Sequence, residues 1–168
     1  MKVLLVTTDA RVEADVRSAL MGEGVDIEQV ATPQRAVAEL LARQGQFAIV
    51  VADGDTAPTG GFSFSYEVKQ RGDMGDDVPP VVLLIAREDD RWMAKWSRAD
   101  ATIRKPIDPF DLEQVVTAIV AGEEIPERPR VHRAVAGFEA VLSASRVIGA
   151  DVPPGDVPVA SGPLSAGP

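Results

Sequence analysis

Two patterns of hydrophobic and polar residues alternate along most of the chain. The first is a short apolar run without polar positions, as at 3–6 and 47–52, which is typical of a strand buried on both faces of a sheet. The second is a stretch in which apolar residues recur every three or four positions, as Val12, Val16 and Ala19 do. This spacing is typical of a helix with one buried face. The chain therefore predicts alternating strands and helices.

The alternation has five strand–helix units. Units of this length predict a parallel sheet with right-handed crossovers and helices on both faces. The expected fold class is α/β, a flavodoxin-like (βα)5 doubly wound parallel sheet with a C-terminal extension. We expect strands at 2–6, 25–30, 47–52, 80–85 and 101–103, and helices at 10–21, 33–45, 62–71, 89–98 and 110–120.

The composition of the chain changes after the last of these helices. A chain of 168 residues has room for one domain with a full core and an appendage. We expect the domain at 1–121 and a proline-containing linker at 122–130. Residues 131–149 could form one amphipathic helix. Residues 150–168 are rich in proline, glycine, serine and alanine, which is typical of a disordered tail.

Composition and charge exclude several classes of function. The longest apolar run, 47–52, is much shorter than the ~18 residues of a membrane span, and the N-terminal run has no cleavage site after it. We therefore expect a cytoplasmic protein without membrane contact. The net charge of −9 and the isoelectric point near 4.6 oppose binding to nucleic acid. Because there is no cysteine and only one histidine, a metal site would have to use carboxylates.

Four charged residues follow the predicted strands. Asp9 comes after the first strand, Asp53 and Asp55 after the third, and Lys105 after the fifth. In doubly wound sheets the carboxyl ends of the strands meet at one edge, where ligands bind. We therefore expect these side chains to lie close together. Two local roles are alternatives: Asp9 as the N-cap of the following helix, and Asp53 as the first residue of an Asx turn.

Two sequence features resemble the receiver domain of bacterial response regulators. One is Asp53 with Gly61 eight positions later, and the other is segment 105–110, which begins Lys-Pro. The resemblance covers residues 2 to about 121. It implies a receiver-type domain in which Asp53 accepts a phosphoryl group from a histidine kinase, Lys105 pairs with the phosphoryl oxygens, and Mg²⁺ bridges the group to an acidic pair. These roles agree with the need for cations when a carboxylate attacks phosphorus.

The chain departs from that family at three places. Thr7 and Thr8 stand where the family has its acidic pair, so the usual Mg²⁺ ligands are absent. Ile85 stands at the position of a hydroxyl residue that bonds the phosphoryl group, and Thr102 at that of the aromatic residue that moves with it. The resemblance therefore implies an atypical receiver in which phosphorylation at Asp53 is impaired or absent.

Two questions about the charged residues stay open. Asp9, Asp53 and Asp55 could together bind Mg²⁺ weakly, because hard divalent cations prefer oxygen ligands, but Asp9 would have to reach inward. Lys105 could keep a phosphoryl-binding role, or it could serve only as a salt-bridge partner of Asp53.

Trp92 and Trp96 stand four positions apart on the helix predicted at 89–98, so they share one face. They either pack against the sheet or the C-terminal helix, or anchor a protein interface, where tryptophan is enriched. In receivers, the face of helix 4, strand 5 and helix 5 is the usual partner and dimer surface. The resemblance therefore implies that a protein partner, a histidine kinase or a second copy of the chain binds there.

The leading hypothesis is an atypical single-domain response regulator, not an enzyme, that acts in phosphorelay-type signal transduction through protein–protein contacts. The alternative is a Mg²⁺-dependent phosphohydrolase that uses Asp53 and Asp55. It arises because the sequence Asp-Gly-Asp-Thr at 53–56 resembles the nucleophile motif of haloacid-dehalogenase-type enzymes. That family usually has its motif after the first strand, whereas the motif here follows the third.

Overall fold

The computed structural model describes residues 1–22, 24–128 and 130–133. The chain divides into two compact units, of which the first, Met1–Ala136, contains all of these residues. The second unit, Gly137–Pro168, lies outside them, and so does the tail expected at 150–168. Among the described residues, no helix combines the length and the apolar character needed to cross a membrane.

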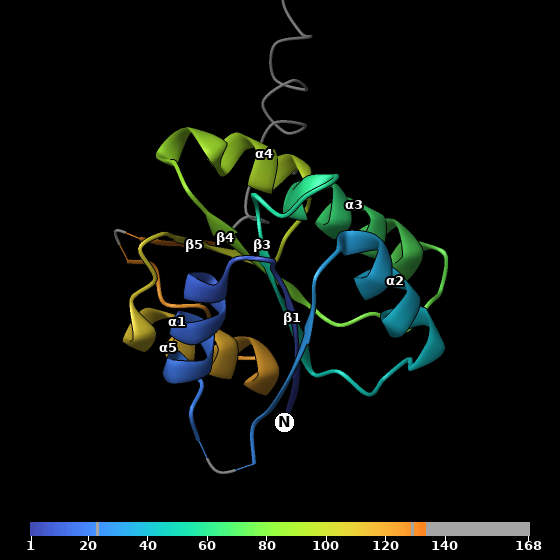
Figure 1. Cartoon of the computed structure of the whole chain (residues 1–168), viewed down its shortest axis with the longest axis horizontal. Coiled ribbons are helices and arrows are strands. Elements are labelled where there is room, and N and C mark those ends of the chain that lie inside the picture. The colour runs from blue at the N-terminus through green and yellow to red at the C-terminus, as the bar shows by residue number, and fades with distance from the viewer. Residues whose placement is uncertain (23, 129, 134–168) are drawn as a thin grey trace, which may run out of the picture. The chain divides into compact units, whose positions relative to one another are not determined.

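The first unit is a six-stranded sheet with helices on both faces (Figure 1). The strand order is β2-β1-β3-β4-β5-β6, in which the first five strands are parallel and β6 is antiparallel to β5. This is the flavodoxin-like order with one added strand, so the predicted fold class is confirmed. The strands are β1 (Lys2–Val6), β2 (Asp26–Val30), β3 (Ile49–Asp53), β4 (Val81–Ile85), β5 (Ala101–Arg104) and β6 (Val131–Arg133). The helices are α1 (Ala10–Ala19), α2 (Pro33–Ala42), α3 (Gly60–Asp73), α4 (Arg91–Trp96) and α5 (Pro109–Ala121), with a short 3-10 helix at Glu88–Asp90.

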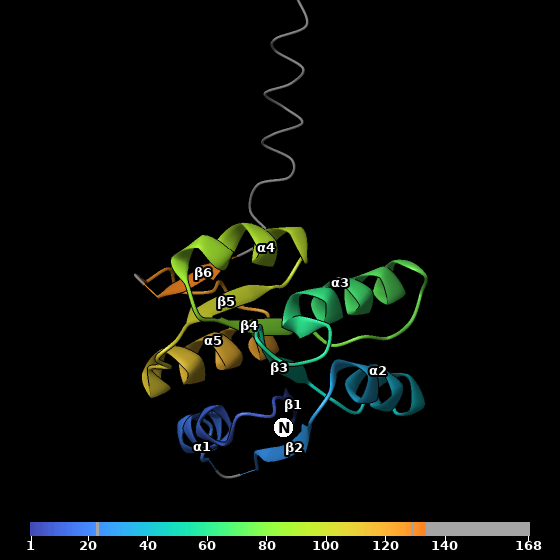
Figure 2. The same ribbon diagram turned by 45° about the horizontal axis from the view of Figure 1, so that its top comes forward.

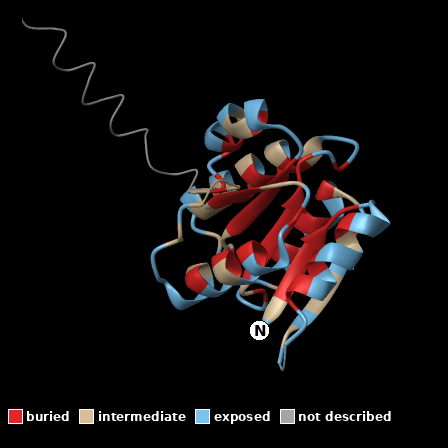
Figure 3. Cartoon of the chain, turned by 90° about the vertical axis from the view of Figure 1, so that its left-hand side faces the viewer, coloured by how far each residue is buried: buried red, intermediate tan, exposed pale blue. Residues whose placement is uncertain are grey.

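Two hydrophobic layers fill the space between the sheet and its helices. Helices α1 and α5 cover one face of the sheet, and α2, α3 and α4 cover the other (Figure 2). Because side chains alternate along a strand, β1 sends Val3 and Leu5 into the first layer and Leu4 and Val6 into the second. Every residue of β3 and β4 is buried, as the red strands in Figure 3 show. The apolar runs without alternation therefore correctly predicted central strands.

Helix starts follow the capping residues of the sequence. The side chain of Thr32 accepts a backbone N–H from the first turn of α2, and Asp108 does the same for α5. The helix expected at 89–98 differs. Its beginning is the 3-10 helix at Glu88–Asp90, where the Asp90 side chain accepts the backbone N–H of Arg87 and closes a tight turn. The α-helical part that presents the two tryptophans is therefore short.

Among the parts of the chain, the C-terminal extension differs most from the structure that the sequence predicted for it. Residues 131–133 form β6 beside β5, where the pattern favoured the start of a helix. The side chain of Val131 is fully buried in the core, and the Thr102 hydroxyl donates to the carbonyl of His132 at 3.3 Å. A strand is favoured here because it pairs the backbone groups of an edge that would otherwise stay open. The remainder of the expected helix, 134–149, lies outside the described residues.

The expected linker at 122–130 is attached to α5. Arg128 donates to Asp111 Oδ1 at 3.2 Å and to Gln114 Oε1 at 2.6 Å. Its guanidinium carbon also lies 4.7 Å from the centre of the Phe110 ring, which adds a cation–π contact. These contacts hold the segment that leads into β6, so the folded domain extends past the boundary expected at residue 121.

Candidate functional site

The ends of three strands bring Thr7, Asp53 and Lys105 together at one edge of the sheet. Asp53 is the last residue of β3, and the parallel register of β1 against β3 places Thr7 beside it. The backbone N–H of Lys105 donates to the carbonyl of Ile85 at 2.8 Å, which continues the pairing of β4 with β5. Loops at the carboxyl ends of parallel strands therefore form the site, as the sequence predicted.

The Asp53 carboxylate has both oxygens engaged. Lys105 Nζ donates to Oδ1 at 2.8 Å, and the backbone N–H of Asp55 donates to the same oxygen at 3.1 Å. The Thr7 hydroxyl donates to Oδ2 at 3.3 Å. Because the Asp53 side chain is only 5% exposed, these three donors replace the water that a free carboxylate would bind.

The Lys105 ammonium bridges two carboxylates, because it also donates to Asp55 Oδ2 at 2.9 Å. Burial is the largest single influence and lowers the pKa of Lys105. The hydrogen bonds and charges of Asp53 and Asp55 together outweigh it, so the pKa lies above its usual value of 10.5. The ammonium therefore stays charged at neutral pH and compensates the buried carboxylate. The salt-bridge role of Lys105 is present in the structure, and its phosphoryl-binding role stays a prediction.

Asp9 lies outside this cluster. Its carboxylate accepts the N–H of Arg11 at 2.8 Å and caps α1, while its own N–H donates to the Thr7 hydroxyl at 3.0 Å. Within the ranges that the structure describes, no three histidine, aspartate or glutamate side chains are grouped so that they could hold a metal ion. Mg²⁺ requires several oxygen ligands, but the two carboxylates that meet here already share an ammonium. The three carboxylates expected to bind Mg²⁺ are therefore not brought together, and the residues as arranged do not form that site.

Ile85 and Thr102 stand where the resemblance implies a hydroxyl and a mobile aromatic residue. Ile85 is fully buried in the apolar layer beneath α2, α3 and α4. Thr102 is also buried, and its hydroxyl binds the backbone of β6. The first position therefore lacks a hydrogen-bond donor, and the second helps to hold the added strand.

The two tryptophans lie on the surface of α4. Trp92 is 68% exposed and Trp96 is 53% exposed, whereas Ala94 on the same helix is buried. Packing against the sheet, one of the expected roles, is therefore wrong. Trp96 stacks instead on Tyr66 of α3, with ring centres 4.7 Å apart and an interplanar angle of 9°. The sequence did not single out Tyr66, because its contact depends on how α3 and α4 lie side by side.

The face formed by α4, β5 and α5 is altered by the extension. Strand β6 pairs with β5 from Ala101 to Ile103, so β5 is not an edge strand. A partner that approached this face would meet β6 as well. We find no support for the homodimer predicted for this surface.

A parallel sheet in the order β2-β1-β3-β4-β5, with a buried aspartate at the end of β3 held by a lysine after β5, defines a receiver-type domain. No family model matches the chain. An uncharacterized response regulatory protein of Mycobacterium tuberculosis, from strains H37Rv and CDC 1551, is 32% identical over 98 residues. The match covers 56% of this chain and 71% of that protein. The chain therefore belongs to the response-regulator family.

Solved structures of receiver domains share the fold. The chemotaxis response regulator CheY4 of Vibrio cholerae superposes with a TM-score of 0.59 at 22% identity, covering 70% of this chain and 97% of that one. A receiver domain protein of Clostridium thermocellum has a TM-score of 0.62 at 15% identity, covering 72% and 94%. At these identities the likeness shows the fold alone. Because these proteins are all response regulators, the comparisons do not favour the phosphohydrolase alternative.

Proposed function

We propose that this chain is an atypical response regulator that acts in phosphorelay-type signal transduction through contacts with other proteins, with phosphorylation at Asp53 impaired or absent. The observation that carries the proposal is the occupied carboxylate of Asp53, whose oxygens bind Lys105, Thr7 and the backbone of Asp55. In this proposal the protein is not an enzyme, and it works in the cytoplasm.

The charges around Asp53 oppose attack on phosphorus. An aspartate that accepts a phosphoryl group needs cations that neutralise the phosphoryl oxygens during transfer. Thr7 and Thr8 offer only neutral hydroxyls where a divalent cation would need carboxylates. Lys105 is then the cation at hand, and it is shared with Asp55. A phosphoryl donor would therefore meet two carboxylates that are hydrogen-bonded to one cation, Lys105.

The residues that would convey phosphorylation to the surface also differ. The apolar side chain of Ile85 can form no hydrogen bond with a phosphoryl group, and Thr102 is engaged with β6. We infer that the contact surface is formed permanently instead of being switched. The aromatic patch, defined as Tyr66, Trp92 and Trp96, is the proposed contact surface on α3 and α4, because exposed tryptophans commonly anchor protein interfaces. A histidine kinase or another signalling protein is the proposed partner.

Restoring the acidic pair is expected to restore phosphorylation. The double substitution Thr7→Asp, Thr8→Asp places one carboxylate beside Asp53 and a second at the next, exposed position, and these can hold a divalent cation together with Asp53. The wild-type chain and this variant are incubated with acetyl phosphate and Mg²⁺, and intact mass is measured. We expect no adduct on the wild type and an adduct of about 80 Da, the mass of one added phosphoryl group, on the variant. Adding Asp53→Asn to the variant should remove the adduct.

A wild-type adduct that is as large as the variant's and that Asp53→Asn abolishes would contradict the proposed impairment and favour the phosphoryl-binding role of Lys105. Because Thr7 is buried, thermal melting followed by circular dichroism checks that the double variant folds. The single substitution Thr8→Asp, at an exposed position, serves where the double variant is unfolded. In that case Thr8→Asp alone should give a measurable adduct, whereas the wild type gives none.

A further inference from the structure

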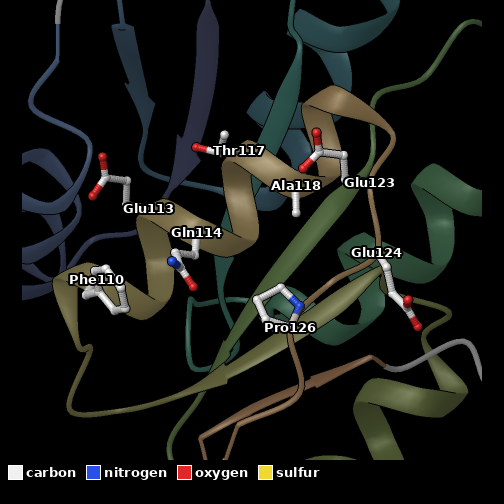
Figure 4. Close-up of a pocket in the computed structure, with 8 residues that line it drawn as sticks. All are labelled: Phe110, Glu113, Gln114, Thr117, Ala118, Glu123, Glu124 and Pro126. Carbon is white, nitrogen blue, oxygen red and sulfur yellow. The ribbon is translucent and has the colours of Figure 1, made fainter.

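A groove lies between α5 and the segment 123–126 that follows it (Figure 4). Its volume is about 470 Å³. Phe110, Ala118 and Pro126 provide its apolar lining, Gln114 and Thr117 its neutral polar lining, and Glu113, Glu123 and Glu124 its charged lining. The groove therefore combines an aromatic ring with three carboxylates, and three of its eight lining residues belong to the segment after α5.

The three glutamates of the groove have no cationic partner among the described residues. Several acidic residues elsewhere in the domain do have such partners, for example Glu28 with Arg43 and Glu88 with Arg91. Arg128 approaches α5 next to the groove, but it pairs with Asp111. The groove is therefore a region of unbalanced negative charge, which attracts cationic groups.

The arrangement of the carboxylates favours separate cationic side chains over a single metal ion. In the described part of the chain, no three acidic or histidine side chains are grouped closely enough to hold one ion. The net charge of −9 opposes nucleic acids and anionic membranes and favours a basic protein. The domain also provides an example of arginine binding beside the groove, where Arg128 lies over the Phe110 ring. That ring is still 53% exposed, so part of it is available to another side chain.

We propose that this groove binds a basic segment of a partner protein, one that places arginine or lysine side chains against Glu113, Glu123 and Glu124 and an apolar group against Phe110. The inference rests on the proposed role in protein contacts and names the chemistry of a partner. Charge complementarity of this kind also accelerates association, because the field of the whole domain steers a basic partner toward it.

The test is a fluorescence anisotropy titration of the full chain with a labelled synthetic peptide of arginine and leucine in an amphipathic helical pattern. A matched peptide has glutamate in place of every arginine. We expect saturable binding of the arginine peptide and none of the glutamate peptide. The variant Glu113→Gln, Glu123→Gln, Glu124→Gln should bind the arginine peptide roughly tenfold more weakly, since three exposed charge pairs of modest strength are lost. All three positions are exposed, so the fold should be retained.

A second triple variant, Asp15→Asn, Asp77→Asn, Asp89→Asn, removes the same amount of charge at exposed positions away from the groove and outside the ion pairs of the described residues. It should weaken binding by less than about twofold, because distant exposed charges are screened. Equal losses in both variants would overturn the inference, because binding would then reflect net charge alone. Self-association of the wild type that the glutamine variant abolishes would also overturn it, since the occupant would be a second copy. Neither the peptide titration nor the test of self-association depends on Asp53. A failure of the proposal on phosphorylation can therefore be distinguished from a failure of this inference.

Discussion

Methionine in place of Lys105 is expected to lower the free energy of unfolding by about 2–3 kcal/mol, because it leaves the buried carboxylate of Asp53 without its cation. This loss is smaller than the loss expected for a fully buried ion pair, because the Lys105 side chain is 21% exposed and water can partly replace it. Asp53→Asn should have a smaller effect, about 1 kcal/mol or less, since Lys105 keeps its bond to Asp55. Urea denaturation at neutral pH measures both values.

The contribution of Lys105 to the free energy of unfolding depends on pH, and the direction of this dependence follows from its pKa. The pKa of Lys105 is raised in the folded protein, so its contribution to stability is fully present below the unfolded value of 10.5. That contribution is lost as the pH rises through the higher folded value. The stability difference between wild type and Lys105→Met should therefore be constant near neutrality and shrink above pH 10.5. If Asp53→Asn were as destabilising as Lys105→Met, the compensating role of Lys105 would be wrong.

Alanine in place of Gly61 is expected to lower the free energy of unfolding by about 3 kcal/mol, because its Cβ atom would overlap the backbone at the end of β3. An ideal Cβ at this position would lie 2.5 Å from the Asp53 carbonyl oxygen and 2.9 Å from the Asp53 carbonyl carbon. These are backbone atoms of a buried strand, so relief requires α3 to move away from β3. Such a movement would also displace the Asp53 side chain from Lys105. Urea denaturation measures the loss.

Gly22→Ala is the matched control for Gly61→Ala. The nearest atom to a Cβ at Gly22 is the Val25 Cγ2 atom, 3.9 Å away, which is an ordinary contact. Its effect should stay within about 0.5 kcal/mol. A similar small effect at Gly61 would show that the start of α3 can shift freely, and would contradict the rigid packing of α3 against the end of β3.

The sequence predicted the sheet and three of the four residues of the site for the same physical reason. Central parallel strands must be apolar on both faces. An uninterrupted apolar run such as 47–52 can therefore be recognised as a central strand from the sequence alone. Once the strands are placed, the sheet topology requires their carboxyl ends to meet, and this brings Asp53, Asp55 and Lys105 together. The prediction for these three residues needed no side-chain geometry.

Other features depended on contacts that a local pattern does not contain. Residues 131–133 show no strand signal of their own, and their structure comes from the open edge of β5 and the buried pocket for Val131. Trp92 and Trp96 point outward because α4 packs on the domain through its other face, at Ala94, and the local pattern did not indicate which face is buried. The sequence showed that Thr7 stands in place of an acidic residue of the family. Its hydrogen bond to Asp53 follows only from the register of β1 against β3.

Strand β6 has a consequence for how the protein can be cut or fused. A chain shortened at the end of α5 would keep every element of an ordinary receiver, yet it would expose the backbone of β5 and the apolar surface that Val131 covers. Bare strand edges recruit other strands, so such a fragment would tend to aggregate. We therefore expect the smallest stable fragment to reach residue 133. Affinity tags or reporter domains are better joined beyond β6 than directly after α5.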